Sequence, residues 1–249
     1  MVVVTGAASG IGRAVAEMFA CHGACVHVLD LKASEAESVV AKIRAAHGSA
    51  KAHVCDVSVR ENVESVFRQI TAEGPIDILV NSAGIAHVGK LENTSEEDFD
   101  AVYRVNVKGT FNCMFACIED MKTRRRGVIL NLASIASSSG LPDRFAYSMS
   151  KGAVRSMTLS VARDYLAYNI RCNCISPARI HTPFVDGFVR KNYPGKEKQM
   201  LQKLNESQPI GRMGEPREVA ALALFLCSGQ AAFVTGADYP LDGGFLNLR

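Results

Sequence analysis

The sequence predicts one α/β domain in which a doubly wound parallel sheet carries helices on both faces. Apolar, β-branched runs alternate with helical patterns along the whole chain. The runs lack alternating polar residues, which is typical of strands buried on both faces, and strands separated by helices form right-handed parallel crossovers. With 249 residues, 48% of them hydrophobic, the chain can bury one sizeable core, so we expect a single dinucleotide-binding catalytic domain over 1–249.

The elements follow from this alternation in order. The three valines of Val2–Thr5 predict a first strand that ends at a glycine-rich turn, and a helical pattern at 11–21 leads to the next strand, Cys25–Asp30. The same signals predict strands at 50–55, 76–81, 128–132, 170–176 and 239–241, and helices at 34–46, 59–73, 98–121, 145–168 and 218–228. Residues 178–214 break the alternation and are rich in Gly, Pro and basic residues, which predicts an irregular substrate lid.

Composition excludes several classes of protein. A net charge of +3 and a pI near 8.4 are too mild to indicate nucleic-acid binding. The longest nearly unbroken apolar run, 219–227, is about half the length of a bilayer span, and the first residues lack the features of a secretion signal. The 8 cysteines form no CxxC pair and have no further ligands at metal-site spacing. We expect a soluble cytoplasmic protein with reduced thiols, no metal, and no membrane or nucleic-acid partner.

The turn after the first strand predicts a dinucleotide site. Its glycines permit a tight turn and close backbone approach, while the N-terminus of the following helix favours a pyrophosphate. The residues expected to contact the cofactor here are Gly6, Ser9, Gly10, Ile11 and Gly12.

Asp30, which ends the second strand, predicts which dinucleotide binds. A carboxylate there can accept hydrogen bonds from both ribose hydroxyls and repels a 2′-phosphate. We therefore expect NAD rather than NADP, although the basic Lys32 lies close by. Asp56 and Val57 end the third strand, where they can bracket the adenine; the alternative for Asp56 is a simple helix N-cap.

Tyr147 and Lys151 lie four residues apart on one predicted helix, hence on one face. A phenol with a reference pKa of about 10 is a poor base at neutral pH. A nearby ammonium can lower that pKa by roughly 1–3 units, so the pair can serve as a proton shuttle. Ser134, at the end of an apolar strand, strengthens this interpretation.

These residues resemble the classical short-chain dehydrogenase/reductase family, which has a Rossmann-type fold, over essentially the whole chain. The matching pieces are TGAASGIG (5–12), Asp30, Asp56-Val57, NSAG (81–84), Asn106, Ser134, YSMSK (147–151), PARIHT (177–182) and LDGG (241–244). Two departures stand out. Ser82 replaces the second Asn of the family's usual NNAG, and Ala178 replaces the glycine expected after Pro177.

The resemblance implies a role for each matching residue. Tyr147 would be the general acid/base, Ser134 would hold the substrate oxygen, and Lys151 would bind the nicotinamide ribose and lower the tyrosine pKa. Asn106 would hold a water that links Lys151 to solvent. The remaining cofactor contacts implied are Asn81, Ala83 and Gly84 on the adenosine side, and Pro177, Ile180 and Thr182 at the carboxamide.

The substrate must be inferred from the variable parts of the chain. We expect contacts from Ser134, Ala136, Tyr147 and Arg179, because a guanidinium at the sheet's carboxyl edge suits carboxylates or vicinal hydroxyls. The sequence resembles the family's sugar and sugar-acid dehydrogenases, so we expect a small sugar, sugar acid or hydroxy acid. The alternatives are an NADPH-dependent 3-oxoacyl-thioester reductase, which Asp30 opposes, and a non-catalytic nucleotide-sensing protein, which the intact catalytic set opposes.

The resemblance also implies a homotetramer. Helices 98–121 and 145–168 carry apolar residues around more than one face, so each needs a second partner beyond the core. The residues concerned are Phe111, Met114, Phe115, Met157, Leu159 and Val161.

Overall fold

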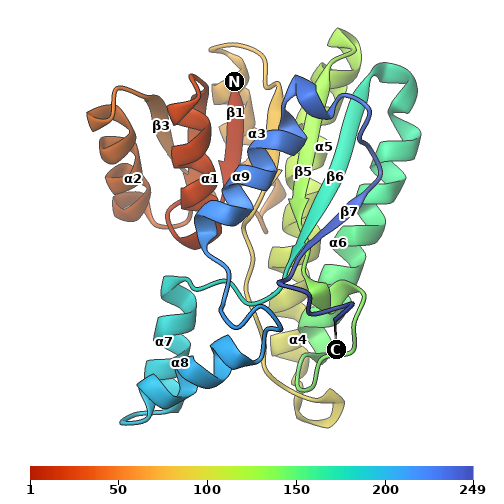
Figure 1. The fold of residues 1–249 in the computed structure, drawn as a ribbon. Helices are drawn as coiled ribbons and strands as arrows, with labels where there is room; N and C mark the ends of the chain where they lie inside the picture. The colour runs from red at the N-terminus through yellow and green to blue at the C-terminus, as the bar shows by residue number, and fades with distance from the viewer. Residues whose placement is uncertain (249) are drawn as a thin grey trace.

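The computed structural model describes residues 1–248, without the side chains of residues 191 and 192. Seven parallel strands form one sheet in the order β3-β2-β1-β4-β5-β6-β7 (Figure 1). The predicted fold class is confirmed. The strands are β1 (Val2–Thr5), β2 (Cys25–Asp30), β3 (Ser49–Val54), β4 (Ile78–Asn81), β5 (Gly127–Leu132), β6 (Ile170–Pro177) and β7 (Asp238–Leu241).

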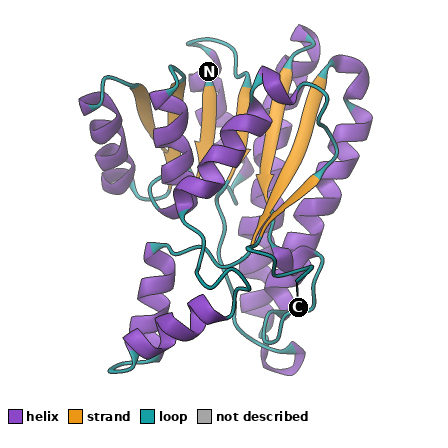
Figure 2. Ribbon diagram, viewed as in Figure 1, coloured by secondary structure: helices purple, strands orange, loops and turns teal. Residues whose placement is uncertain are grey.

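Helices cover both faces of this sheet (Figure 2). One face packs against α1 (Gly10–Cys21), α2 (Ala33–Ala45) and α9 (Pro216–Cys227), and the other against α3 (Arg60–Thr71), α5 (Gly109–Arg124) and α6 (Phe145–Asp164). Three further helices, α4 (Glu96–Val102), α7 (Pro183–Asn192) and α8 (Glu197–Glu206), lie beyond the carboxyl ends of the strands (Figure 1).

Strand β1 explains why the runs are apolar without interruption. Val2 and Val4 pack into the core beside α1, α2 and α9, while Val3 packs into the core beside α3 and α5. Successive side chains of a strand point to opposite faces of the sheet. In a strand covered by helices on both faces, every side chain is therefore buried, and apolar residues are favoured at each position.

The strand order reverses at β1, which pairs with β2 on one side and β4 on the other. The connection from β2 to β3 and the connection from β4 to β5 run in opposite directions along the sheet. This divergence opens a crevice at the carboxyl ends of the strands. The residues after β1, β2, β4, β5 and β6 therefore meet at one edge.

Two predicted elements need correction. The predicted helix 98–121 consists of α4, a π-helical turn at Tyr103–Lys108, and α5. The predicted irregular segment 178–214 contains the helices α7 and α8. Glycines and prolines concealed these short helices in the sequence, but Pro183 lies in the first turn of α7, where proline's missing N–H would be unpaired in any case.

The cysteines are free thiols, and Cys55, Cys113, Cys117, Cys172, Cys174 and Cys227 are buried. Within residues 1–248, no helix is long and apolar enough to cross a membrane. The same part of the chain holds no group of three or more His, Cys, Asp or Glu side chains placed to bind a metal ion.

Candidate active site

A cavity of about 990 Å³ lies at this carboxyl edge. It is lined by the glycine turn after β1, by the ends of β2, β4, β5 and β6, and by residues of α6, α7 and α8. Most of the residues predicted from the sequence line it: Gly6, Ser9, Gly10, Ile11, Gly12, Asp30, Asp56, Val57, Ala83, Gly84, Ser134, Tyr147, Lys151, Pro177, Arg179, Ile180 and Thr182.

The glycine turn fits close contact with a phosphate group. Gly6 and Gly10 have left-handed backbones, with φ of +63° and +52°, which residues with a Cβ rarely adopt. A Cβ at Gly12 would lie 2.3 Å from the carbonyl oxygen of Gly6. Ser9, the N-cap of α1, makes no side-chain capping bond, so the first N–H groups of the helix stay available. These residues fit the pyrophosphate of a dinucleotide.

Thr5 joins this turn to the end of β4, a role that the sequence reasoning missed. Its Oγ1 accepts hydrogen bonds from the backbone N–H groups of Ser82 and Ala83, both at 3.1 Å. Thr5 stands in the TGAASGIG motif, so its position was visible but its partner was not. The contact holds two walls of the cavity together.

Asp30 is held at the end of β2 by two backbone groups. Its Oδ2 accepts from Ala8 N–H at 3.1 Å and its Oδ1 from Lys32 N–H at 3.2 Å. The ammonium of Lys32 is 2.8 Å from Glu35. A negative charge is therefore fixed on this part of the cavity wall, and the nearest basic side chain is engaged with another carboxylate.

The adenosine side differs from expectation at Asn81. That residue is buried, its amide donates to Asn131 at 2.8 Å, and it does not line the cavity. It belongs to β4, whereas the cavity is lined by the residues that follow it, including Ser82. Asp56 does line the cavity, and one of its carboxylate oxygens accepts from both the backbone and the hydroxyl of Ser58 in an Asx turn. It does not cap the next helix, because the N-cap of α3 is Val59.

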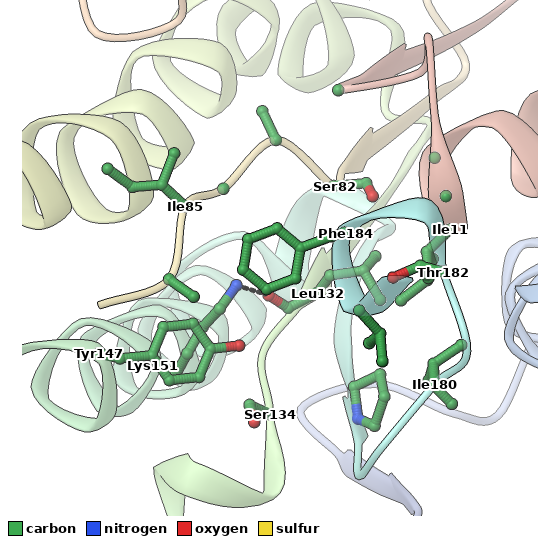
Figure 3. Close-up of a pocket in the computed structure, with 18 of the residues that line it drawn as sticks. Ile11, Ser82, Ile85, Leu132, Ser134, Tyr147, Lys151, Ile180, Thr182 and Phe184 are labelled. Carbon is green, nitrogen blue, oxygen red and sulfur yellow. Dashed lines mark hydrogen bonds between the residues drawn. The ribbon is translucent and has the colours of Figure 1, made fainter. Parts of the chain in front are cut away.

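Tyr147, Lys151 and Ser134 converge on the centre of the cavity (Figure 3). Lys151 donates to the carbonyl of Leu132 at 2.7 Å, and its Nζ lies 5.8 Å from the centre of the Tyr147 ring. Burial lowers the pKa of Lys151 to about 8. Burial raises the pKa of Tyr147, while the Ser134 hydroxyl and the charge of Arg144 act in the opposite direction. The tyrosine thus keeps its proton at neutral pH in this state.

Asn106 lies in the π-helical turn behind this centre and does not line the cavity. Its amide donates to the carbonyl of Ile85 at 2.9 Å and to Ser150 at 3.0 Å, and its oxygen accepts from Ile85 N–H. A Cβ at Gly84 would lie 3.2 Å from the Asn106 oxygen and 3.6 Å from the Lys151 ammonium. Asn106 therefore braces the chain after β4 against α6, directly beside Lys151.

The chain leaving β6 forms the opposite wall. Ala178 donates its N–H to Leu241 at 3.0 Å and does not have a positive φ, so the missing glycine causes no backbone strain. Ile180 forms a parallel bridge to Gly214. Thr182 is the N-cap of α7 without a side-chain capping bond, which leaves its hydroxyl available to the cavity.

One expected substrate contact, Ala136, is buried and lies outside the cavity lining. Its N–H donates to Ser134 Oγ at 3.2 Å and so helps to position Ser134. The cavity lining also includes Arg144, Phe184, Phe188, Leu204, Ser207, Met213 and Phe245. Five of these residues, from Phe184 to Met213, lie within the segment 178–214 that the sequence predicts to be the substrate lid.

The chain is similar to known oxidoreductases over nearly its whole length. Residues 6–246 match a family described as enoyl-(acyl carrier protein) reductase. The chain is 41% identical to an NAD-dependent glycerol dehydrogenase of Listeria innocua, covering 98% of this chain and 92% of the relative. It is 36% identical to a 3-oxoacyl-[acyl-carrier-protein] reductase of Thermotoga maritima, covering 98% and 96%. The crystal structure of levodione reductase superposes with a TM-score of 0.93 at 31% identity, covering 98% and 96%.

Replacing Lys151 with methionine is expected to raise the melting temperature of the cofactor-free protein by a few degrees at pH 7. The folded pKa of about 8 lies below the reference 10.5, so the buried ammonium destabilises the fold below pH 8. That destabilisation decreases as the pH rises from about 8 to 10.5, because the ammonium loses its proton. The increase in melting temperature caused by Lys151→Met should therefore become smaller over the same pH range. Thermal unfolding monitored by circular dichroism across this range tests the expectation.

Lys198→Met, on the exposed surface of α8, is the matched control and should show no such trend. A gain at Lys151 that stays constant with pH, or a lower melting temperature at pH 7, contradicts the prediction.

Proposed function

This chain belongs to the classical short-chain dehydrogenase/reductase family and is an oxidoreductase acting on CH–OH groups, and we propose that it transfers a hydride between NAD(H) and a small sugar, sugar acid or hydroxy acid. One observation carries the proposal. The Tyr147–Lys151 pair and the glycine turn with Asp30 line one continuous cavity. A protein that only binds a nucleotide would need the glycine turn and Asp30, but it would not need the Tyr147–Lys151 pair.

The chain's own residues would handle the proton. A bound nicotinamide supplies the hydride acceptor in oxidation and the hydride donor in reduction. In oxidation the substrate carbon loses a hydride while its hydroxyl proton passes to Tyr147; in reduction Tyr147 returns a proton to the carbonyl oxygen. Ser134 would hold that oxygen. Lys151 would favour the phenolate by its charge and bind the ribose once released from Leu132.

NAD is the proposed cofactor within the NAD(P) class. The carboxylate of Asp30 lines the cavity, and the ammonium of Lys32 pairs with Glu35 at 2.8 Å. A 2′-phosphate beside Asp30 would meet a like charge, whereas a ribose diol would meet an acceptor. The relative named as an NAD-dependent glycerol dehydrogenase supports the same choice.

The second candidate is reduction of 3-oxoacyl thioesters with NADPH. It is favoured by the acyl-carrier-protein reductase description of the matching family and by the 36% identical relative. Asp30 argues against this candidate, because its carboxylate repels the 2′-phosphate of NADPH. Assay with both substrate classes and both cofactors separates the two candidates.

We place the enzyme in the cytoplasm as a homotetramer. Free thiols support a reducing compartment. Phe111 and Phe115 on α5 and Leu159 on α6 are each more than 40% exposed, on the two helices that pack on the sheet face opposite α1 and α9, which supports burial against another subunit. Of the other predicted interface residues, Met114 is buried in the core of this subunit. Met157 and Val161 pack against the same core.

Tyr147→Phe is expected to lower turnover by about 10²–10⁴-fold, because only the transferable proton is removed. Affinity for NAD, measured by calorimetry, should change little. Tyr168→Phe removes a phenol outside the cavity lining and should leave both quantities unchanged. Activity of Tyr147→Phe within a few-fold of wild type would mean that another group carries the proton.

The wild-type enzyme is expected to show a higher kcat/KM with NAD than with NADP, and Asp30→Ala should reduce that preference mainly by raising the KM for NAD. The reason is that the substitution removes both the ribose acceptor and the charge that repels a 2′-phosphate. Steady-state assays at 340 nm with each cofactor measure both effects. A wild-type preference for NADP would overturn this proposal and indicate that Lys32 binds the 2′-phosphate.

Light scattering at micromolar concentration is expected to give a tetrameric mass. The double variant Phe111→Asp, Phe115→Asp should give a smaller mass, since charges cannot be buried against an apolar partner surface. A monomeric wild-type mass would contradict the prediction.

A further inference from the structure

Arg144 lines the cavity from the N-cap position of α6, the helix that carries Tyr147 and Lys151. Its backbone forms a parallel bridge with Gly89, and the preceding Asp143 has a left-handed φ of 57°. One of its terminal nitrogens donates to the carbonyl of His87 at 3.3 Å. Its charge helps to lower the pKa of Tyr147, so the guanidinium lies within electrostatic reach of the reacting phenol.

Arg179 reaches the same part of the cavity from the end of β6. Its backbone carbonyl accepts from Gly214 at 2.9 Å, and its Nε donates to Ser207 Oγ at 3.0 Å. Ser207 in turn donates to Leu204, so the side chain is anchored through Nε to the end of α8. Burial lowers the pKa of Arg179, and the positive charge of Arg144, which lines the same cavity, adds to the effect.

Neither arginine has an anionic partner. Within residues 1–248, no carboxylate lies within 4 Å of Arg144 or Arg179, although Asp143 is adjacent in sequence. The acidic residues among the described cavity lining are Asp30 and Asp56, both on the adenosine side. The cavity is thus negative at one end and carries two unpaired positive charges at the other.

The surroundings of the two arginines strengthen any ion pair formed there. Much of the remaining wall is apolar, with Leu141, Phe184 and Met213 among its residues. Ion pairs are stronger where apolar groups exclude water, and a guanidinium fork matches a carboxylate in two parallel hydrogen bonds.

We propose that Arg144 and Arg179 together bind a carboxylate of the substrate, so that the enzyme acts on a hydroxy acid or sugar acid in preference to a neutral polyol. This inference rests on the dehydrogenase function proposed above. Because Arg144 is three residues from Tyr147, the carboxylate lies within a few carbon atoms of the hydroxyl that is oxidised. The two like charges repel one another in the free enzyme, and the bound carboxylate offsets that repulsion.

The test compares acids with neutral partners of the same shape. Reduction of NAD is followed at 340 nm with hydroxybutyrates and aldonic acids, each paired with its methyl ester or amide, and with glycerol and glycerol 3-phosphate. At least one acid is expected to exceed its neutral partner by tenfold or more in kcat/KM. Arg144→Gln and Arg179→Gln should each lower the ratio of kcat/KM for the acid to kcat/KM for its neutral partner by about 10- to 100-fold, mainly by raising the KM for the acid.

Arg190→Gln, an exposed arginine of α7 outside the cavity lining, is the matched control and should behave as wild type. Neutral substrates used as well as the acids, or variants that affect both classes equally, would overturn the carboxylate site and leave the dehydrogenase function standing. A preference for glycerol 3-phosphate over the carboxylates would overturn the carboxylate assignment.

Absence of hydride transfer with every alcohol would instead overturn the dehydrogenase function. Carboxylate binding is then read separately by calorimetric titration of the same acids into the enzyme with NADH. Binding that is lost in both arginine variants, while their NADH affinity matches wild type, supports the site. No binding to wild type overturns it.

Discussion

Burial of a parallel sheet on both faces is the constraint on which the rest of this molecule depends. It requires helical crossovers, and these bring the carboxyl end of every strand to one edge. Because the strand order reverses at β1, with β2 and β3 on one side and β4 to β7 on the other, the crossovers diverge there and leave the crevice that becomes the cavity. The glycine turn, Asp30, Ser134 and the residues after Pro177 meet because each follows a strand of this sheet.

The centre of the site is built at the expense of stability. Lys151 is 7% exposed, and the hydrogen-bond acceptor that the structure gives its ammonium is the carbonyl of Leu132. A buried charge with one neutral acceptor disfavours the folded state, which is why burial lowers its pKa to about 8. Because the ammonium has one neutral acceptor, it is available for the contacts with a ribose and a phenolate that we propose. Groups that lower the stability of the folded protein are common at functional sites, where activity requires them.

How far the sequence predicted the structure depended on the range of the interactions involved. Strands and most helices follow from local patterns and were predicted correctly, and the glycine turn and the Tyr147–Lys151 pair lie in the lining of one cavity. Asn81 and Ala136 lie outside that lining, because a shift of one or two residues along a strand or turn moves a side chain from the cavity into the core. The convergence of Arg144 and Arg179 lies beyond local patterns, since 35 residues and the whole of α6 and β6 separate them.

The two ends of the cavity are held by different kinds of contact, and this explains their different predictability. The cofactor side is fixed by partly buried bonds, such as those between Thr5 and Ser82 and between Asn106 and Ile85, whose geometry leaves little freedom to the residues involved. The substrate side is held through exposed contacts of α7 and α8, such as Arg179 to Ser207. Exposed helices tolerate substitution more readily than a braced core does. The motifs shared with the family therefore identify the chemistry of the cofactor side. The substrate side must be inferred from the charges and shapes of the residues that line it in this chain.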